Sequence, residues 1–272
     1  MHPPRPAGVP QAPARDVHGT QQEERAGGCR RYATGTLCRQ SPGRYGFSVL
    51  PTGRVKASSA PLAPPWAAGV AVAALLAGSL LAALVWHATR LDPVDAWVLR
   101  WQELANSRAD ALATLVAATL KPVVVATMVA GTLLGWLVRR RDLTVLTLAA
   151  LPATLAAEIL LKWAVHRQWE GDPDLLFPSG HAAMATAAAL IAVLAVRVTA
   201  APLRLRPVVA WTAASYVAAI VVARLVETVH SLTDLLGGAA LGLVVTLGMA
   251  LAITAWCGAD ASGSRPTARR CR

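Results

Sequence analysis

The apolar residues of this chain are gathered into blocks of about twenty, and this pattern limits the possible folds more than any other feature. A helix needs roughly twenty apolar residues to cross the hydrocarbon core of a bilayer. Of the 272 residues, 55% are hydrophobic and only 15% are charged. The sequence therefore predicts a polytopic membrane protein of the all-α class.

Six apolar segments predict six transmembrane helices within one membrane domain, residues 61–257. Their expected bounds are 65–86, 122–138, 143–165, 180–196, 207–226 and 232–256. Between the first two, residues 87–121 alternate Trp and Leu with charged side chains at helical spacing, which predicts a helix lying along the membrane interface. This helix would be an anchor or a lid, and its tryptophans favour an anchor.

The two ends of the chain are polar. Residues 1–60 are rich in Pro, Gly, Arg and Gln and lack apolar periodicity, so we expect a disordered basic tail, unless translation begins further along the chain. They contain no apolar core of a signal peptide. Residues 258–272 form a second tail. The four cysteines fall in these tails or, for Cys257, directly before the second one, without metal-ligand spacing, which predicts neither a disulfide framework nor a metal site.

The distribution of basic residues predicts the orientation in the membrane. The net charge of +11 comes from the tails and from the turns around 139–141 and 197–206, which favours a cytoplasmic location for all of these and no interaction with nucleic acid. The interfacial helix, residues 166–178 and residues 227–231 then lie on the extracytoplasmic side of the cell membrane. The candidate reactive residues converge on that side.

Lys162 and the segment that follows Pro178 suggest a binding site for an anion. Lys162 lies within an apolar block, where a cation serves a site, pairs with Glu158 one turn earlier, or extends to the lipid headgroups. Ser179 and Gly180 begin a helix, whose free amides and positive dipole end suit a phosphate. His181 then supplies a proton donor. The alternative is an ordinary capping turn beside an interfacial histidine.

Arg224, His230 and Asp234 lie around the start of the last apolar segment. If that helix begins at or just before His230, the imidazole and the Asp234 carboxylate share one face. The carboxylate would then fix the tautomer of His230 and leave the other ring nitrogen free as a nucleophile.

The segment Pro178-Ser179-Gly180-His181, followed by Arg224, His230 and Asp234 at spacings of six and four residues, resembles the type 2 phosphatidic acid phosphatase family, whose domain is shared with vanadium haloperoxidases. The resemblance implies metal-independent hydrolysis of phosphoesters or diphosphates through a phosphohistidine. It assigns His230 as nucleophile, Asp234 as its orienting carboxylate and His181 as acid. It implies phosphate ligands at Lys162, Ser179, Gly180 and Arg224.

The first family motif is incomplete in this chain. The family pattern places Arg-Pro seven residues after its lysine, whereas this sequence has Trp169 and Glu170. Arg167 lies two residues earlier and is expected to turn toward the phosphate as a substitute ligand. A lost contact of this kind costs about 1.5–3 kcal/mol, so the change predicts weakened activity or a different substrate.

The predicted function is a membrane phosphatase that acts on a lipid phosphate or an isoprenoid diphosphate such as undecaprenyl diphosphate, without a cofactor and without an obligatory protein partner. Three alternatives use the same residues. The chain could bind or transport a lipid phosphate without turnover, or transfer the phospho group to another acceptor. In the third, His181, His230 and Asp234 hold a metal ion, which the neighbouring cations disfavour.

Overall fold

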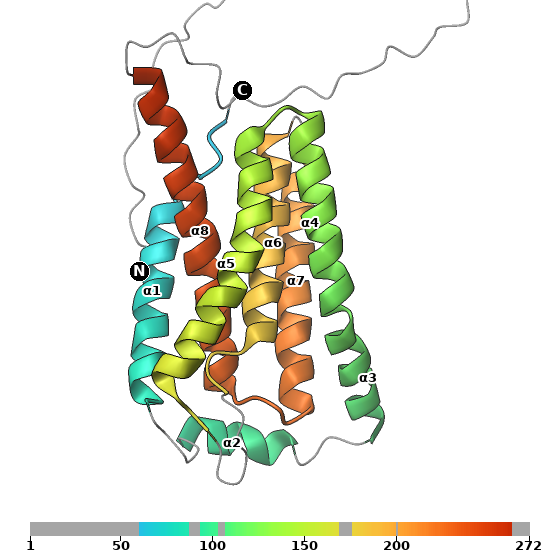
Figure 1. Cartoon of the computed structure of the whole chain (residues 1–272). Helices are drawn as coiled ribbons and strands as arrows, with labels where there is room; N and C mark the ends of the chain where they lie inside the picture. The colour runs from blue at the N-terminus through green and yellow to red at the C-terminus, as the bar shows by residue number, and fades with distance from the viewer. Residues whose placement is uncertain (1–59, 87–92, 103–106, 169–175, 200, 263–272) are drawn as a thin grey trace, which may run out of the picture. The chain divides into compact units, whose positions relative to one another are not determined.

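The computed structural model describes residues 60–86, 93–102, 107–168, 176–199 and 201–262. All regular structure in these ranges is helical (Figure 1). The helices are α1 (Ala67–Leu84), α2 (Pro93–Gln102), α3 (Ser107–Ala118), α4 (Leu120–Leu137), α5 (Arg141–Val165), α6 (Gly180–Val198), α7 (Leu205–Val226) and α8 (Leu232–Ser262). They belong to one compact unit, Thr52–Arg272. The predicted tail 1–59 and residues 263–272 lie outside the described ranges.

Six of the helical segments are long and apolar enough to cross a membrane, as the sequence predicted. They are Ala67–Leu84, Arg108–Leu137, Arg141–Val165, Gly180–Val198, Leu205–Val226 and Leu232–Cys257. Many of their large apolar side chains are exposed, including Leu76 and Leu84 of α1, Leu160 of α5 and Trp211 of α7. A chain with such a surface is stable in lipid, where these side chains contact acyl chains.

The segment between the first two spans differs from its prediction as one interfacial helix. It forms two helices: α2 runs across one end of the bundle, whereas α3 runs into α4 (Figure 1). The alternating pattern of residues 87–121 therefore belongs to two helices of different orientation. Leu112 and Leu115 of α3 are exposed, as expected for the beginning of the 30-residue apolar segment Arg108–Leu137.

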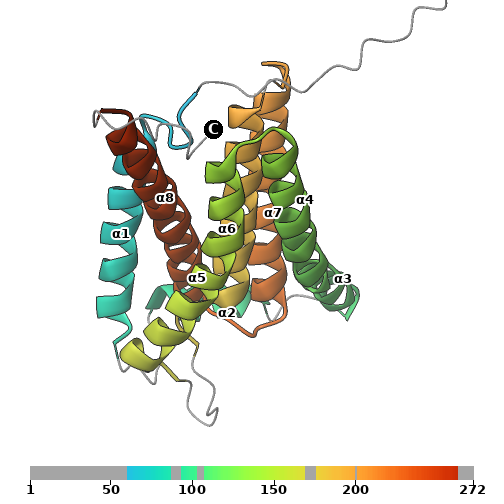
Figure 2. The same cartoon turned by 45° about the horizontal axis from the view of Figure 1, so that its top comes forward.

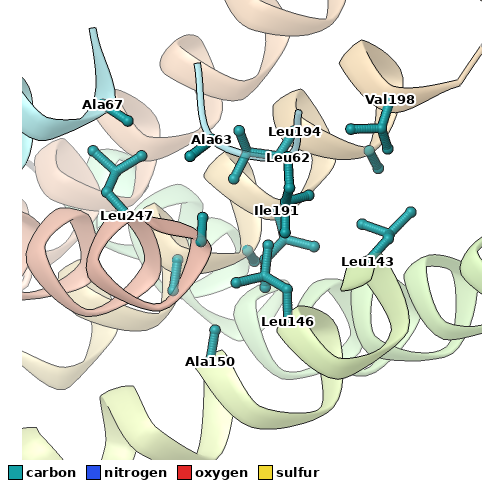
Figure 3. Packing of buried hydrophobic residues seen from close by; sticks show 14 of the residues in the cluster. Leu62, Ala63, Ala67, Leu143, Leu146, Ala150, Ile191, Leu194, Val198 and Leu247 are labelled. Atoms are coloured by element: carbon teal, nitrogen blue, oxygen red, sulfur yellow. The ribbon is translucent and has the colours of Figure 1, made fainter. Parts of the chain in front are cut away.

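Helix α6 lies at the centre of the bundle, packed against α4, α5, α7 and α8 (Figures 1 and 2). Its inner surface is rich in alanine, with Ala182, Ala183, Ala185, Ala187 and Ala188 all buried. Small side chains let neighbouring helices approach closely in a membrane. Larger side chains complete the core nearer the other end of α6, where Leu146 of α5, Ile191 and Leu247 of α8 belong to one cluster (Figure 3).

Two glycines of α8 set the distance between α6 and α8. A Cβ atom on Gly238 would meet the carbonyl oxygen of Ser179, and one on Gly242 would lie 2.5 Å from the carbonyl oxygen of Ala183. A side chain at either position would push the helices apart. These two glycines thus allow the start of α8 to lie beside the start of α6.

The end of the bundle that carries the turn between α4 and α5 is closed by the segment before α1. The Arg140 guanidinium donates to the carbonyl oxygen of Ala60 across 3.1 Å and pairs with Asp142 at 2.6 Å. At this end α8 continues to Ser262, beyond the predicted start of the tail at residue 258. Cys257 is disulfide-bonded, so the prediction from cysteine positions was wrong on this point. Its partner lies outside the described residues.

Candidate active site

The predicted site residues are carried by segments that meet at one end of the bundle. Lys162 is in the last turn of α5, Gly180 and His181 begin α6, and Arg224 is in the last turn of α7. His230 lies between α7 and α8, and Asp234 is in the first turn of α8. Helix α2 runs across this end (Figure 1). The alternating directions of the spans therefore place these residues together.

A backbone hydrogen bond joins the starts of α6 and α8. The Ser179 amide donates to the carbonyl oxygen of Asp234 across 3.0 Å. Ser179 is the N-cap residue of α6, yet its Oγ atom is buried and has no hydrogen-bond partner. A buried hydroxyl without a partner loses free energy of hydration. The hydroxyl is therefore available to a ligand bound at the first turn of α6.

The start of α8 is a capping box formed by Ser231 and Asp234. The Asp234 carboxylate accepts from the Ser231 amide at 3.1 Å, and Ser231 Oγ accepts from the Asp234 amide at 3.3 Å. The sequence Ser-x-x-Asp before an apolar run is a known signal for this motif. It satisfies two amides of the helix start and fixes the chain immediately after His230.

Arg167 is buried in a network of ion pairs. Its Nη1 atom donates to Asp234 Oδ1 at 2.8 Å, and its Nη2 atom donates to Asp95 Oδ2 at 2.9 Å. Asp95, from α2, also accepts from the amide of Thr233 at 3.0 Å. The Arg167 side chain is only 1% exposed. Arg167 thus ties α2 to the start of α8.

The two remaining cations each have an acidic partner one helical turn away. Lys162 Nζ lies 2.8 Å from Glu158 Oε1, which is the ion pair that the sequence offered as one alternative. Arg224 Nη1 donates to Glu227 Oε2, while its buried Nε atom has no partner. Each cation therefore uses some of its N–H donors for an acidic partner within the protein.

His230 is a neutral imidazole at ordinary pH. Its side chain lies outside the helices and is 7% exposed, and its buried Nδ1 atom has no hydrogen-bond partner. Burial, together with the positive charges of Arg224, Lys162 and His181, lowers its pKa from 6.5 to about 3. These groups therefore act on the same imidazole, and an unprotonated ring nitrogen is available as a nucleophile.

Two expectations about individual residues need correction. Asp234 does not hold His230, because the Nδ1 atom of His230 has no hydrogen-bond partner. His230 also precedes α8, which begins at Leu232, so the shared-face argument does not apply. The carboxylate caps α8 and pairs with Arg167 instead. Arg167 was expected to turn toward a phosphate, but both of its terminal nitrogens are bound to buried acceptors. Trp169 and Glu170, the altered motif positions, lie outside the described residues.

Three acidic residues near the site have little signal in the sequence. Asp95 was hidden in a segment interpreted as amphipathic, and Glu227 was not considered as a partner of Arg224. Glu158 was seen only as a partner of Lys162, although its carboxylate also reaches the start of α6. The capping-box pattern of Ser231 and Asp234 is present in the sequence and indicates that the Asp234 carboxylate caps α8.

Alternatives to this site would be a metal-binding cluster or a cavity away from these helix starts. Among the residues that the structure describes, no group of three or more His, Cys, Asp or Glu side chains is placed to share a metal ion, so His181, His230 and Asp234 do not form one. A cavity of about 800 Å³ lies at the opposite end, beside the turn between α4 and α5. Its lining contains no histidine and no carboxylate.

Comparisons with known proteins bear on the fold. The structure resembles the crystal structure of the transmembrane PAP2 type phosphatidylglycerolphosphate phosphatase from Bacillus subtilis, with 19% sequence identity, a TM-score of 0.53, and coverage of 72% of this chain and 98% of the other. This likeness shows a shared fold. A search of curated protein sequences found no significant match. Residues 152–256, which carry all the predicted phosphate-site residues, match the family model of the PAP2 superfamily.

Proposed function

We propose that this chain is a membrane phosphatase that hydrolyses a lipid phosphate or an isoprenoid diphosphate, with His230 as the nucleophile. One observation carries the proposal. Two buried polar atoms without partners, Ser179 Oγ and His230 Nδ1, belong to segments that are joined by the bond from Ser179 to Asp234. Lys162 and Arg224 supply positive charge beside them. A tetrahedral anion satisfies such a set of groups.

The reaction begins with in-line attack. A ring nitrogen of His230 forms a bond to phosphorus while the bond from phosphorus to the leaving oxygen breaks, and His181 donates a proton to that oxygen. Lys162 and Arg224 neutralise the charge that develops on the remaining phosphate oxygens. Water then attacks phosphorus and gives a proton to His181, the bond between phosphorus and nitrogen breaks, and phosphate leaves. No step uses a metal ion.

Asp234 acts in this scheme as a positioning residue. It holds the turn at Ser231 and thereby the chain beside His230, and Arg167 holds Asp234 in turn. The site faces the extracytoplasmic side in this proposal, because the arginine-rich turn between α4 and α5 lies at the opposite end of the bundle and favours the cytoplasm.

The test is a phosphate-release assay with the purified full-length protein in detergent and a metal chelator. Phosphatidic acid and undecaprenyl diphosphate serve as substrates. We expect release from at least one of them, and loss of that activity in His230→Asn and His181→Asn. His166→Asn is the matched control, because His166 ends α5 with a positive φ of 52° that asparagine tolerates.

A catalytically weakened binding protein is the second candidate, and the ion pairs of Lys162 and Arg224 favour it, since both cations are already neutralised. Binding of inorganic phosphate by the unmodified protein, without release from any substrate, would select this candidate. Activity that disappears in chelator and returns with a divalent metal would contradict the metal-free mechanism.

A further inference from the structure

The carboxylate of Glu158 occupies a place that the proposed mechanism reserves for phosphate. A Cβ atom on Gly180 would lie 2.5 Å from both Glu158 Oε1 and Glu158 Oε2, so the carboxylate rests against the first residue of α6. Free amides and the positive end of the helix dipole stabilise an anion at this point. Glu158 is therefore an anion from the protein itself at the proposed anion site.

The same carboxylate also holds a proposed phosphate ligand. Its Oε1 atom lies 2.8 Å from Lys162 Nζ, and the Glu158 side chain is only 9% exposed. An entering phosphate needs both the ammonium group and the start of α6. Because like charges repel strongly at such distances in a partly buried site, Glu158 has to withdraw from one or both contacts when a phosphate binds.

A second carboxylate adds to this effect. Glu227 pairs with Arg224, and these side chains are 10% and 13% exposed. With His230 neutral, the charges of Lys162 and Arg224 are balanced by those of Glu158 and Glu227. The phosphate-free site thus has little net charge, whereas a site built to hold a highly charged anion keeps an excess of positive charge.

We propose that Glu158 is a specificity-determining residue that competes with the substrate phosphate for Lys162 and the start of α6, and thereby favours a phosphomonoester over the more highly charged diphosphate. This inference rests on the proposed function. It decides between the two substrate classes given above, because the repulsion from Glu158 increases with the negative charge of the group that enters.

The test compares Glu158→Gln with the unmodified protein. Glutamine has the same shape and can remain against Gly180, but it neither repels phosphate nor neutralises Lys162. We expect inorganic phosphate, measured by direct titration and by competitive inhibition, to bind roughly tenfold more tightly, as for the loss of one like-charge contact. KM for phosphatidic acid falls while kcat changes little, and kcat/KM for undecaprenyl diphosphate rises more than for phosphatidic acid.

Asp142→Asn is the matched control, since Asp142 pairs with Arg140 at the opposite end of the bundle. It should leave phosphate binding unchanged. The gain in Glu158→Gln should become smaller when Lys162→Gln is added, because Glu158 and phosphate then no longer compete for the ammonium group. If Glu158→Gln does not fold, Glu158→Asp, which withdraws the carboxylate from Gly180 by one methylene, should give a smaller gain of the same sign.

Weaker or unchanged phosphate binding in Glu158→Gln would overturn the inference, since it would show that Glu158 orients Lys162 or only fills space. An equal rise in kcat/KM for phosphatidic acid and undecaprenyl diphosphate would overturn the claim that Glu158 discriminates between substrates by their charge. The direct titration needs no turnover. It therefore tests Glu158 even if no lipid is hydrolysed, and that absence of hydrolysis would count against the proposed function alone.

Discussion

The backbone amide of Ser179 donates to the carbonyl oxygen of Asp234 across 3.0 Å, and this bond joins the two segments from which the proposed chemistry comes. His181 follows Ser179 by two residues, and His230 precedes Asp234 by four. Because this bond fixes the starts of α6 and α8 to one another, His181 and His230 are positioned without a direct bond between them. The predictions below test how this junction is built.

Gly238→Ala should separate the two helix starts. The added methyl group would meet the carbonyl oxygen of Ser179 and lie 3.1 Å from the Cβ atom of Ala182. We expect a loss of about 1–3 kcal/mol in the free energy of unfolding, as for other overpacked sites. Phosphate release should fall roughly tenfold or more, because small displacements at an active site have large effects on rate. Thermal unfolding in detergent and the release assay measure the two effects.

Gly248→Ala provides the control on the same helix, since nothing lies within 4 Å of a Cβ atom at Gly248. Alanine favours a helix over glycine by about 1 kcal/mol, so this variant should be as stable as the unmodified protein or more stable. Full activity in Gly238→Ala would show that close approach of α6 and α8 is not needed.

Arg167→Met should destabilise the protein strongly. The change leaves the buried carboxylates of Asp95 and Asp234 without their shared cation, and breaking a buried ion pair in this way costs about 3–5 kcal/mol. The thermal unfolding midpoint should fall clearly, whereas Arg100→Met, at an exposed position of α2, should change stability by no more than about 0.5 kcal/mol.

The same variant separates a structural role of Arg167 from phosphate binding. A phosphate ligand would give a protein of normal stability with a raised KM. If Arg167→Met unfolds at the same temperature as the unmodified protein and only KM rises, the network with Asp95 and Asp234 does not describe the working enzyme.

The pKa of His230 predicts how stability depends on pH. The unfolded chain takes up a proton on this histidine near pH 6.5, whereas the folded protein resists protonation until about pH 3. Between these values the unfolded state binds more protons, so the free energy of unfolding falls as the pH is lowered from 6.5 toward 3. Above pH 6.5 the histidine makes no pH-dependent contribution.

His230→Asn should therefore flatten the dependence of the unfolding midpoint on pH between about 6.5 and 4.5, as measured by thermal scans in detergent. Gly248→Ala, which changes no titratable group, serves as the comparison and should keep the slope of the unmodified protein. Equal slopes in all three proteins would show that His230 is not held in its neutral form by burial.

Much of the fold could be predicted because each membrane helix is a continuous run of apolar residues in the sequence. The apolar blocks fixed the number of spans, and the predicted bounds of α5, α6 and α7 agree with the structure at one end each. Ser179 and Gly180 were correctly placed at a helix start, because Pro178 and the alanine-rich run that follows constrain the chain on both sides.

The hydrogen-bond partners within the site could not be predicted in the same way. The expected contact between Asp234 and His230 is missing because the carboxylate caps α8 at Ser231 and pairs with Arg167, a residue distant in sequence. Asp95 reaches Arg167 and Thr233 only because α2 crosses the end of the bundle. The contact between Glu158 and Gly180 depends on how α5 packs against α6, and neither residue indicates it alone.

The most direct test of the account is to trap the covalent intermediate. Protein incubated with phosphatidic acid that carries a radioactive phosphate is quenched in alkali, which preserves phosphohistidine, and the labelled peptide is identified by mass spectrometry. We predict an acid-labile label on His230 that is absent in His230→Asn and present in His166→Asn. Phosphate release by His230→Asn at the rate of the unmodified protein, or a label on another residue, would contradict the account.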